Sequence, residues 1–228
     1  MTTPATLNTQ TLGSASSNRV LRNTYWLLSL SLIPTIIGAF IGTNMSFAFM
    51  AESPIMGSLI MLAIMFGLIF GVQALRNSIA GVFLLLGFTF VMGVFLGPIL
   101  QYAAGFSNGA EMVGVAAGGT ALVFFTLATI ATVSKRDFSS LGKFLMIGLV
   151  MLIVAMIANI FLQMPALSLT LSVLAVLIFS GLILFDVSRI VNGGETNYVM
   201  ATLALYLNIY NLFVNLLHLL LAFAGNRE

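Results

Sequence analysis

The chain has 228 residues, of which 60% are hydrophobic and only 6% are charged. Soluble domains average roughly a quarter charged residues, so this composition excludes a soluble fold and predicts an integral membrane protein. Cysteine is absent, which excludes disulfides, thiol catalysis and thiolate metal sites. The net charge of +2 comes from eight basic and six acidic residues. We interpret this charge as a sign of how the loops are placed across a membrane, and not as a nucleic-acid-binding surface.

The N-terminal residues 1–18 are rich in Ser, Thr, Asn and Gln and have no apolar period. They predict a disordered cytoplasmic tail, and residues 19–228 predict one transmembrane domain. Seven apolar stretches follow, each long enough for one membrane-spanning helix of about 20 residues. They are Tyr25–Phe47, Met56–Leu75, Ile79–Tyr102, Met112–Val133, Phe144–Leu162, Leu167–Phe185 and Tyr198–Phe223. These runs do not alternate apolar and polar residues, which excludes barrel strands. The fold class is therefore an all-α membrane protein with seven transmembrane helices.

The basic residues lie in alternate loops. Seven of the eight fall on one side of the predicted membrane, and Arg227 is the exception. The seven are Arg19, Arg22, Arg76, Lys135, Arg136, Lys143 and Arg189. Because positive loops stay in the cytoplasm, the pattern predicts a cytoplasmic N-terminus and a C-terminus outside.

The first four apolar stretches each contain a glycine pair, and two of them contain a proline. Glycine pairs four residues apart let helix backbones approach closely, and we interpret these pairs as ordinary tight packing. The pairs are Gly38/Gly42, Gly67/Gly71, Gly93/Gly97 and Gly114/Gly118. Pro34 and Pro98 lie inside stretches and are expected to kink them.

The last stretch carries Asn208, Asn211, Asn215 and His218. Steps of three, four and three residues put these polar groups on one helical face. Polar groups are costly in lipid, so this stripe should face protein or water. Two interpretations stay open, a hydrated pathway and hydrogen bonds between helices. His218 is expected to be a plain interfacial residue, and a single His without other ligands does not favour a metal site.

Asp186 follows the apolar run IFSGLILF and precedes Arg189. Burial disfavours the charged form of a carboxyl group, so Asp186 could act as a proton-sensitive latch. Alternatively, it lies at the membrane boundary and pairs with Arg189 three residues later.

Several activities have no support in the sequence. The seventh stretch has no lysine for a retinal Schiff base, and no phosphate loop or dinucleotide fingerprint is present. Ser180 and His218 alone do not indicate a hydrolase. No cofactor is expected, and the predicted protein is not an enzyme.

The block LFDVSRIVNGGETNYVMATLALYLNIYNLFVNLLHLL, residues 184–220, resembles the C-terminal signature of the Bax inhibitor-1 family. The shorter stretches VLRNTYWLLSLSL, LGPIL, GGTALVFF and ANIFLQMPALSL agree with this. Within the family, the chain is most similar to the proteobacterial modulators of the membrane-bound AAA+ protease FtsH. The resemblance implies a seven-helix bundle with a central C-terminal helix in the bacterial inner membrane. It also implies an inhibitor that binds an FtsH-type protease, with the lipid bilayer as its surroundings and no nucleic-acid partner.

A physical mechanism fits this implication. A processive protease needs an unstructured handle, which residues 1–18 would supply. A compact bundle behind the handle could then resist extraction and occupy the protease.

The alternative function comes from the same family, some of whose members leak calcium or protons past a pair of aspartates. The first of these matches Asp186, and the second aligns with Asn208. Losing one acid removes the coupling between two carboxyl groups and weakens a calcium site. Any leak should therefore be weaker and less dependent on pH. Arg76 and Arg189 are candidate counter-charges at this gate.

Overall fold

The structure is a computed structural model that describes residues 5–48, 52–134 and 136–225, with side chains from residue 17 onward. Every regular element in this part of the chain is an α-helix. The helices are α1 (Ala5–Thr43), α3 (Pro54–Ala74), α4 (Ile79–Phe95), α5 (Gly97–Ala104), α6 (Gly109–Val133), α7 (Leu141–Leu162), α8 (Pro165–Val191) and α9 (Tyr198–Gly225). Seven spans among them are long and apolar enough to cross a membrane, with α4 and α5 together forming the third. The predicted fold class is confirmed.

The third span is broken where a proline was expected to kink it. α4 ends at Phe95, and α5 begins at Gly97 with Pro98 in its first turn. Proline has no N–H to donate, and the first turn of a helix needs none, so a new helix starts there at no cost in hydrogen bonds. Pro34, by contrast, lies inside α1, which continues through it.

The sixth span is longer than hydropathy predicts. α8 continues past Phe185 to Val191, so the boundary expected at Phe185 is wrong and Asp186 lies inside the helix. An apolar run ends at the first charged residue, whereas a helix ends where the backbone turns. That turn comes at Gly193, whose φ of 76° is easily adopted only by glycine.

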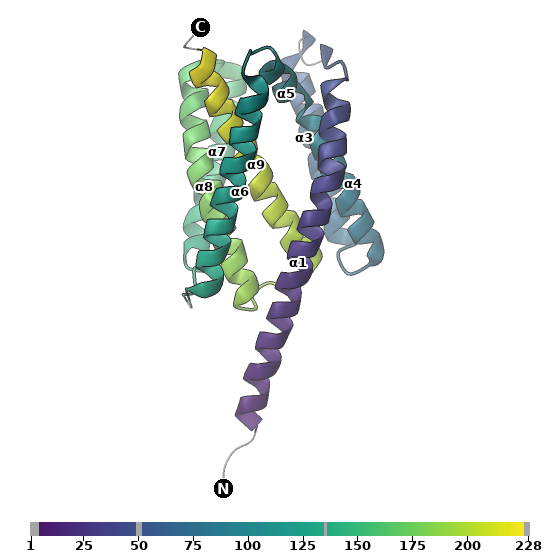
Figure 1. Ribbon diagram of the computed structural model, residues 1–228, viewed down its shortest axis with the longest axis vertical. Coiled ribbons are helices and arrows are strands. Elements are labelled where there is room, and N and C mark those ends of the chain that lie inside the picture. The colour runs from purple at the N-terminus through teal and green to yellow at the C-terminus, as the bar shows by residue number, and fades with distance from the viewer. Residues whose placement is uncertain (1–4, 49–51, 135, 226–228) are drawn as a thin grey trace.

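α1 begins at Ala5, and its first turns project beyond the bundle (Figure 1). The structure thus draws residues 5–18 as helix, where composition predicts disorder. A helix that leaves the bundle gains little tertiary packing, which supplies most helical stability in proteins. The domain boundary at residue 18 therefore stays a prediction.

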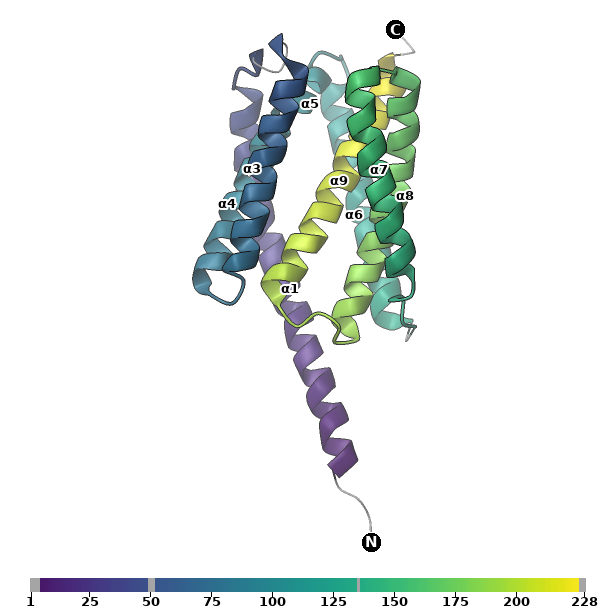
Figure 2. The ribbon, with the colours of Figure 1, turned by 180° about the vertical axis from the view of Figure 1, so that it is seen from behind.

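The bundle has two sides with α9 between them (Figures 1 and 2). α1, α3 and α4 form one side, and α6, α7 and α8 form the other. α9 packs against α8, α6 and α1 and also contacts α3, α4 and α5. Its leucines Leu205, Leu212 and Leu217 are fully buried. The C-terminal helix is therefore central, as the resemblance implies.

Two of the four glycine pairs lie where α1 crosses α4. A Cβ added at Gly38 would meet the Phe90 carbonyl oxygen, and one added at Gly93 would meet that of Thr35. Likewise, a Cβ at Gly42 would lie 2.5 Å from the Val94 carbonyl oxygen. At Gly67, Gly114 and Gly118 an added Cβ would meet nothing within 4 Å. The tight-packing interpretation is thus confirmed for the first and third pairs and is wrong for Gly114/Gly118.

One end of the bundle collects all the basic residues that the structure describes, and we call it the basic end. α1 enters the bundle there, α6 and α8 end there, and α7 and α9 begin there. Its basic residues are Arg19, Arg22, Arg76, Arg136, Lys143 and Arg189. The two chain termini lie at opposite ends of the molecule (Figure 1).

Candidate functional site

The predicted gate residues meet near the basic end. Asn208 on α9 donates a hydrogen bond from its Nδ2 to Oδ2 of Asp186 on α8, at 2.7 Å. Asn208 is buried and Asp186 is half-buried. A polar pair of this kind joins two helices inside an apolar bundle, where each partner would otherwise be unsatisfied.

The turn between α8 and α9 is built by glycine. The N–H of Gly193 donates to the Ile190 carbonyl, at 3.1 Å, and the N–H of Gly194 donates to the Arg189 carbonyl, at 2.8 Å. These two bonds and the positive φ of Gly193 form a Schellman motif, which satisfies the last carbonyls of α8. The sequence Asn-Gly-Gly after an apolar helix predicts such a stop.

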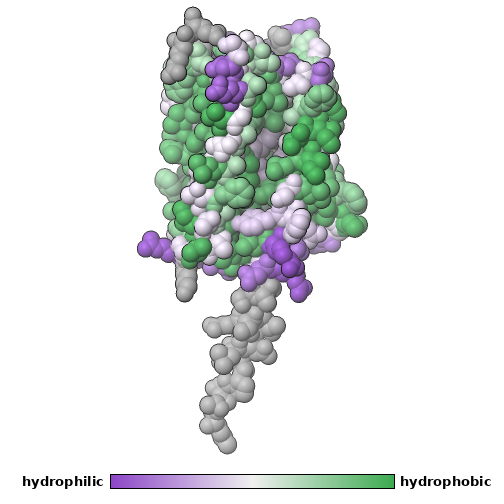
Figure 3. All heavy atoms as spheres, viewed as in Figure 1, coloured by the Kyte–Doolittle hydropathy of each residue, from purple (hydrophilic) through white to green (hydrophobic). Residues whose placement is uncertain are grey.

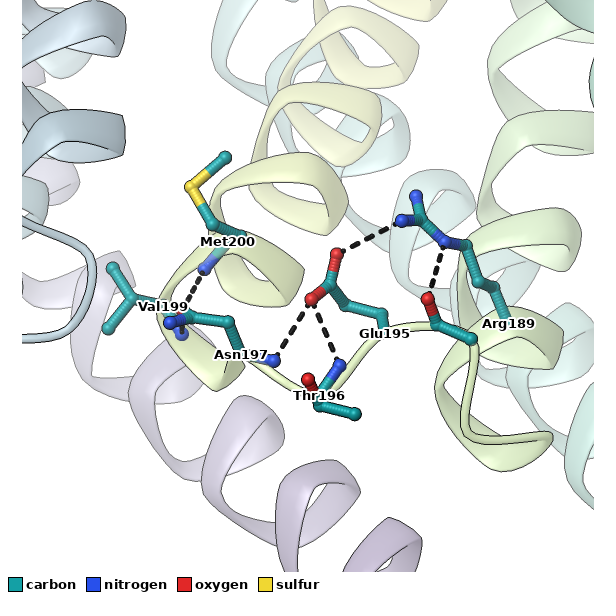
Figure 4. Close-up of polar contacts among 7 residues, drawn as sticks. Arg189, Glu195, Thr196, Asn197, Val199 and Met200 are labelled. Carbon is teal, nitrogen blue, oxygen red and sulfur yellow. Dashed lines mark hydrogen bonds and ion pairs between the residues drawn. The ribbon is translucent and has the colours of Figure 1, made fainter.

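Arg189 is paired, but not with Asp186. Its Nη2 lies 3.3 Å from Oε2 of Glu195, and its Nε donates to the Gly194 carbonyl at 3.1 Å (Figure 4). Glu195 also accepts hydrogen bonds through Oε1 from the N–H groups of Thr196 and Asn197. The alternative in which Asp186 pairs with Arg189 is therefore wrong: the tight turn brings the Glu195 carboxylate to the guanidinium instead.

Asn197 starts α9 and ties it to a second loop. Its Oδ1 accepts from the N–H groups of Val199 and Met200, which caps the free donors of the first turn (Figure 4). Its Nδ2 donates to the Arg76 carbonyl at 3.1 Å and to Oδ1 of Asn77 at 2.8 Å. The loop between α3 and α4 is thus held against the start of α9.

The side chain of Arg76 does not act as the expected counter-charge. It is exposed, and it forms no ion pair with any carboxylate in the described ranges. The residue contributes its backbone carbonyl instead, as the acceptor for Asn197. A basic residue at the bundle surface is solvated readily, so it gains little by turning towards a half-buried acid.

A small cavity of about 20 Å³ adjoins the gate residues. Asp186, Arg189, Glu195 and Met200 are among its lining residues. This volume holds about one water molecule, and the lining offers both acidic and basic partners for it. Glu195 lines the same cavity as Asp186 and is a second acid close to it. Spacing along the sequence does not reveal this neighbour.

The residues of the polar stripe on α9 form two kinds of hydrogen bond, within α9 and between α9 and α8. Asn211 donates to the Leu207 carbonyl and Asn215 to the Asn211 carbonyl, each at 2.8 Å and each within α9. Asn208 and His218 instead reach α8, where His218 Nδ1 lies 2.9 Å from the Ser172 hydroxyl. His218 is half-buried and bonded to another helix, so the expectation of a plain interfacial residue is wrong. The interhelical interpretation is confirmed for these two residues only.

A second polar junction was not expected from the sequence. The Tyr206 hydroxyl lies 2.9 Å from the Thr35 hydroxyl and donates to the Thr89 carbonyl at 3.3 Å. It joins α9 to α1 and α4 at the depth where the glycines let those two helices approach. Tyr206 precedes Asn208 by two residues and so lies off the stripe, which is why the periodicity of the asparagines does not reveal it.

The site has one membrane-embedded carboxylate with an amide partner. No group of three or more acidic or histidine side chains that could hold a metal ion occurs among the described residues. The arrangement can exchange hydrogen bonds between Asp186, Asn208 and a single water, which suits a latch between α8 and α9.

Comparison with known proteins gives consistent matches over the whole bundle. The family model described as inhibitor of apoptosis-promoting Bax1 matches residues 17–225. The modulator of FtsH protease YccA of Escherichia coli K12 is 44% identical over 205 residues, which cover 90% of each chain. A membrane protein of Vibrio cholerae is 41% identical over 221 residues, 96% of this chain and 97% of the relative. A protein of Neisseria meningitidis serogroup A is 43% identical over 217 residues, 94% and 96% of the two chains. With its seven-span bundle, central α9 and matching family model, the chain belongs to the Bax inhibitor-1 family.

Proposed function

We propose that this chain is an inner-membrane modulator of an FtsH-type AAA+ protease and that it restrains the protease by binding, without catalysis. The similarity to the E. coli protein named modulator of FtsH protease, at 44% identity over 90% of both chains, carries the proposal. The proposed orientation puts the N-terminus and the basic end in the cytoplasm and the C-terminus in the periplasm.

The mechanism uses the N-terminal segment as a handle. α1 continues from residue 18 into the bundle without a break, so a pull on a handle formed by residues 1–18 acts directly on the membrane-embedded part of α1. That part is held by close backbone contact with α4 and by the Tyr206 hydroxyl of α9. A protease that engages the handle would meet this resistance and stay occupied.

Deleting residues 1–18 tests the handle. We expect the truncated chain to lose its inhibition of proteolysis of a membrane substrate by the purified protease. A matched control replaces residues 1–18 with an unstructured Gly/Ser segment of equal length. The handle mechanism requires that this control still inhibits. Full inhibition by the deletion would refute the mechanism, and failure of the full-length chain to co-purify with the protease would refute the partner.

A second candidate function is an ion leak for calcium or protons, and the Asp186–Asn208 hydrogen bond favours it. The bond couples the ends of α8 and α9 beside a cavity large enough for a water molecule. Calcium prefers several oxygen ligands, often with more than one carboxylate. Glu195 lies near Asp186 at this gate, but Arg189 and the N–H groups of Thr196 and Asn197 already engage it. The leak should therefore be small.

Flux through liposomes that contain the purified chain separates the two functions. If the chain conducts, Asp186→Asn should change the calcium or proton flux, and Asn208→Asp should make it more dependent on pH by adding a coupled acid. Asn211→Asp is the matched control, because the side-chain amide of Asn211 donates to a carbonyl of its own helix rather than to α8. Flux equal to that of empty liposomes at every pH would remove this candidate.

A further inference from the structure

A long groove lies between α1 and α6, with α9 at its floor. It is separate from the Asp186–Asn208 site, and the polar junction of Thr35 and Tyr206 forms part of its lining. Its volume is about 680 Å³. Apolar side chains such as Leu32, Phe125 and Phe213 dominate its lining, and hydroxyl groups are interspersed among them. Figure 3 shows this face of the molecule, where pale, weakly polar residues run between green apolar flanks. Leu32 and Phe125 are exposed in the bundle alone, so the groove opens sideways towards lipid.

The length of the groove suits a hydrocarbon chain of one membrane leaflet. The lining extends along α6 from Ala117 to Val133, which is about 24 Å at the rise of an α-helix. Along α1 the lining runs from Tyr25 to Ile36, about 17 Å, close to the thickness of one leaflet of hydrocarbon.

The end of the groove at the basic end is polar. The Tyr25 hydroxyl is buried and lacks a hydrogen-bond partner of good geometry in the described chain, with the Thr132 hydroxyl nearby. The Tyr25 ring packs edge-on against Phe124 of α6, with ring centroids 6.1 Å apart, so it bridges the two helices. The Tyr25 and Thr132 hydroxyls therefore make this end of the groove more polar than the rest of its lining.

Two arginines lie close to this polar end along the chain. Arg22 lies one turn before Tyr25 on the same face of α1, and Arg136 follows the end of α6. Both are exposed, and neither forms an ion pair with a residue that the structure describes. The nearest acid in sequence is Asp137, whose pKa is lowered by hydrogen bonds from the side chain and backbone of Ser139. That carboxylate is therefore engaged with Ser139, and both guanidinium groups remain available to an anion.

We propose that the groove binds one acyl chain of an anionic phospholipid, with its phosphate between Arg22 and Arg136. An acyl chain is the apolar ligand present at this depth, and basic residues at a membrane surface attract anionic lipids. The bound lipid fills the space between α1 and α6, so it acts as a part of the bundle wall.

Native mass spectrometry of the full-length chain, extracted from vesicles of equal phosphatidylethanolamine and phosphatidylglycerol, tests this. Wild type should retain one phosphatidylglycerol. Ala121→Trp, which fills the groove from α6, should lose it. The matched control is Ala63→Trp, at an exposed position in the middle of α3 outside the groove, which should retain it. Arg22→Gln with Arg136→Gln should retain a lipid but lose the preference for phosphatidylglycerol.

A second measurement does not depend on a bulky substitution. The chain has one tryptophan, Trp26, so Trp26→Phe gives a background for single-tryptophan variants. Brominated phosphatidylglycerol should quench Phe125→Trp in the groove at a low mole fraction, and it should quench Phe66→Trp on α3 only in proportion to its mole fraction. Equal quenching at the two positions overturns the proposal. So does equal lipid retention by wild type and Ala121→Trp, or a wild-type groove occupied by a second copy of the chain.

Discussion

Within the described part of the chain, Asp186 receives its hydrogen bond from a single side chain. Asn208 donates to its Oδ2, and Arg189, the nearest basic residue along the helix, is held by Glu195. Removing one partner of a buried hydrogen bond leaves the other with its full desolvation penalty, which is larger than the net contribution of the bond. The stability of the α8–α9 contact should therefore be more sensitive to Asn208 than to the other asparagines of the stripe.

We predict that Asn208→Ala lowers the free energy of unfolding by about 1–3 kcal/mol, because Asp186 loses its partner. Asn211→Ala is the matched control. Its amide donates to a carbonyl of its own helix that is already bonded in the helix, so the loss should be about 0.5 kcal/mol or less. Unfolding of both variants in detergent checks this. Equal losses would mean that the contact between Asp186 and Asn208 is not what stabilises this end of the bundle.

The sequence predicts some of the site residues and misses their partners, for a physical reason. Helical spacing shows that Asn208, Asn211, Asn215 and His218 share a face of α9. It does not show which helix lies opposite each of them. Asn211 and Asn215 donate to carbonyls of their own helix, whereas His218 meets Ser172 on α8. The Asp186–Asn208 pair was predictable only through the family resemblance.

At the scale of elements, glycine pairs with the same spacing pack differently in different helices. Gly38, Gly42, Gly93 and Gly97 all lie where a Cβ would meet backbone atoms of the neighbouring helix. Gly114 and Gly118 have the same spacing on α6 but meet nothing within 4 Å. The spacing predicts which residues share a helix face, and only the crossing of α1 and α4 decides which pair is needed.

We predict that Gly93→Ala lowers the free energy of unfolding by about 1–3 kcal/mol, because its Cβ would press on the Thr35 carbonyl and a backbone cannot move aside cheaply. Gly118→Ala is the matched control. Its Cβ enters open space, and alanine favours the helix over glycine by up to about 1 kcal/mol, so this variant should be neutral or more stable. The reverse order of stabilities, measured by thermal unfolding in one detergent, would contradict the packing of α1 on α4.

At the scale of the whole molecule, the number of spans follows from local hydropathy and their arrangement does not. Seven apolar runs predict seven spanning helices because each run must cover the same hydrocarbon thickness. The position of α9 between two groups of three helices depends on contacts between residues far apart in the chain, such as Thr35 with Tyr206. The sequence gives one indication of the central position of α9, because a helix with a polar stripe is disfavoured where it faces lipid.

The orientation of the bundle gives the last prediction. All the described basic residues lie at the end where α1 enters, and basic loops are retained in the cytoplasm. Alkaline phosphatase, which is active only outside the cytoplasm, should be active when fused after residue 225 and inactive when fused after residue 138, between α6 and α7. Green fluorescent protein exported through the general secretory route does not fluoresce, so its fusions should show the opposite pattern. If phosphatase is active after residue 138, the basic end faces the periplasm, and a cytoplasmic protease could not engage residues 1–18.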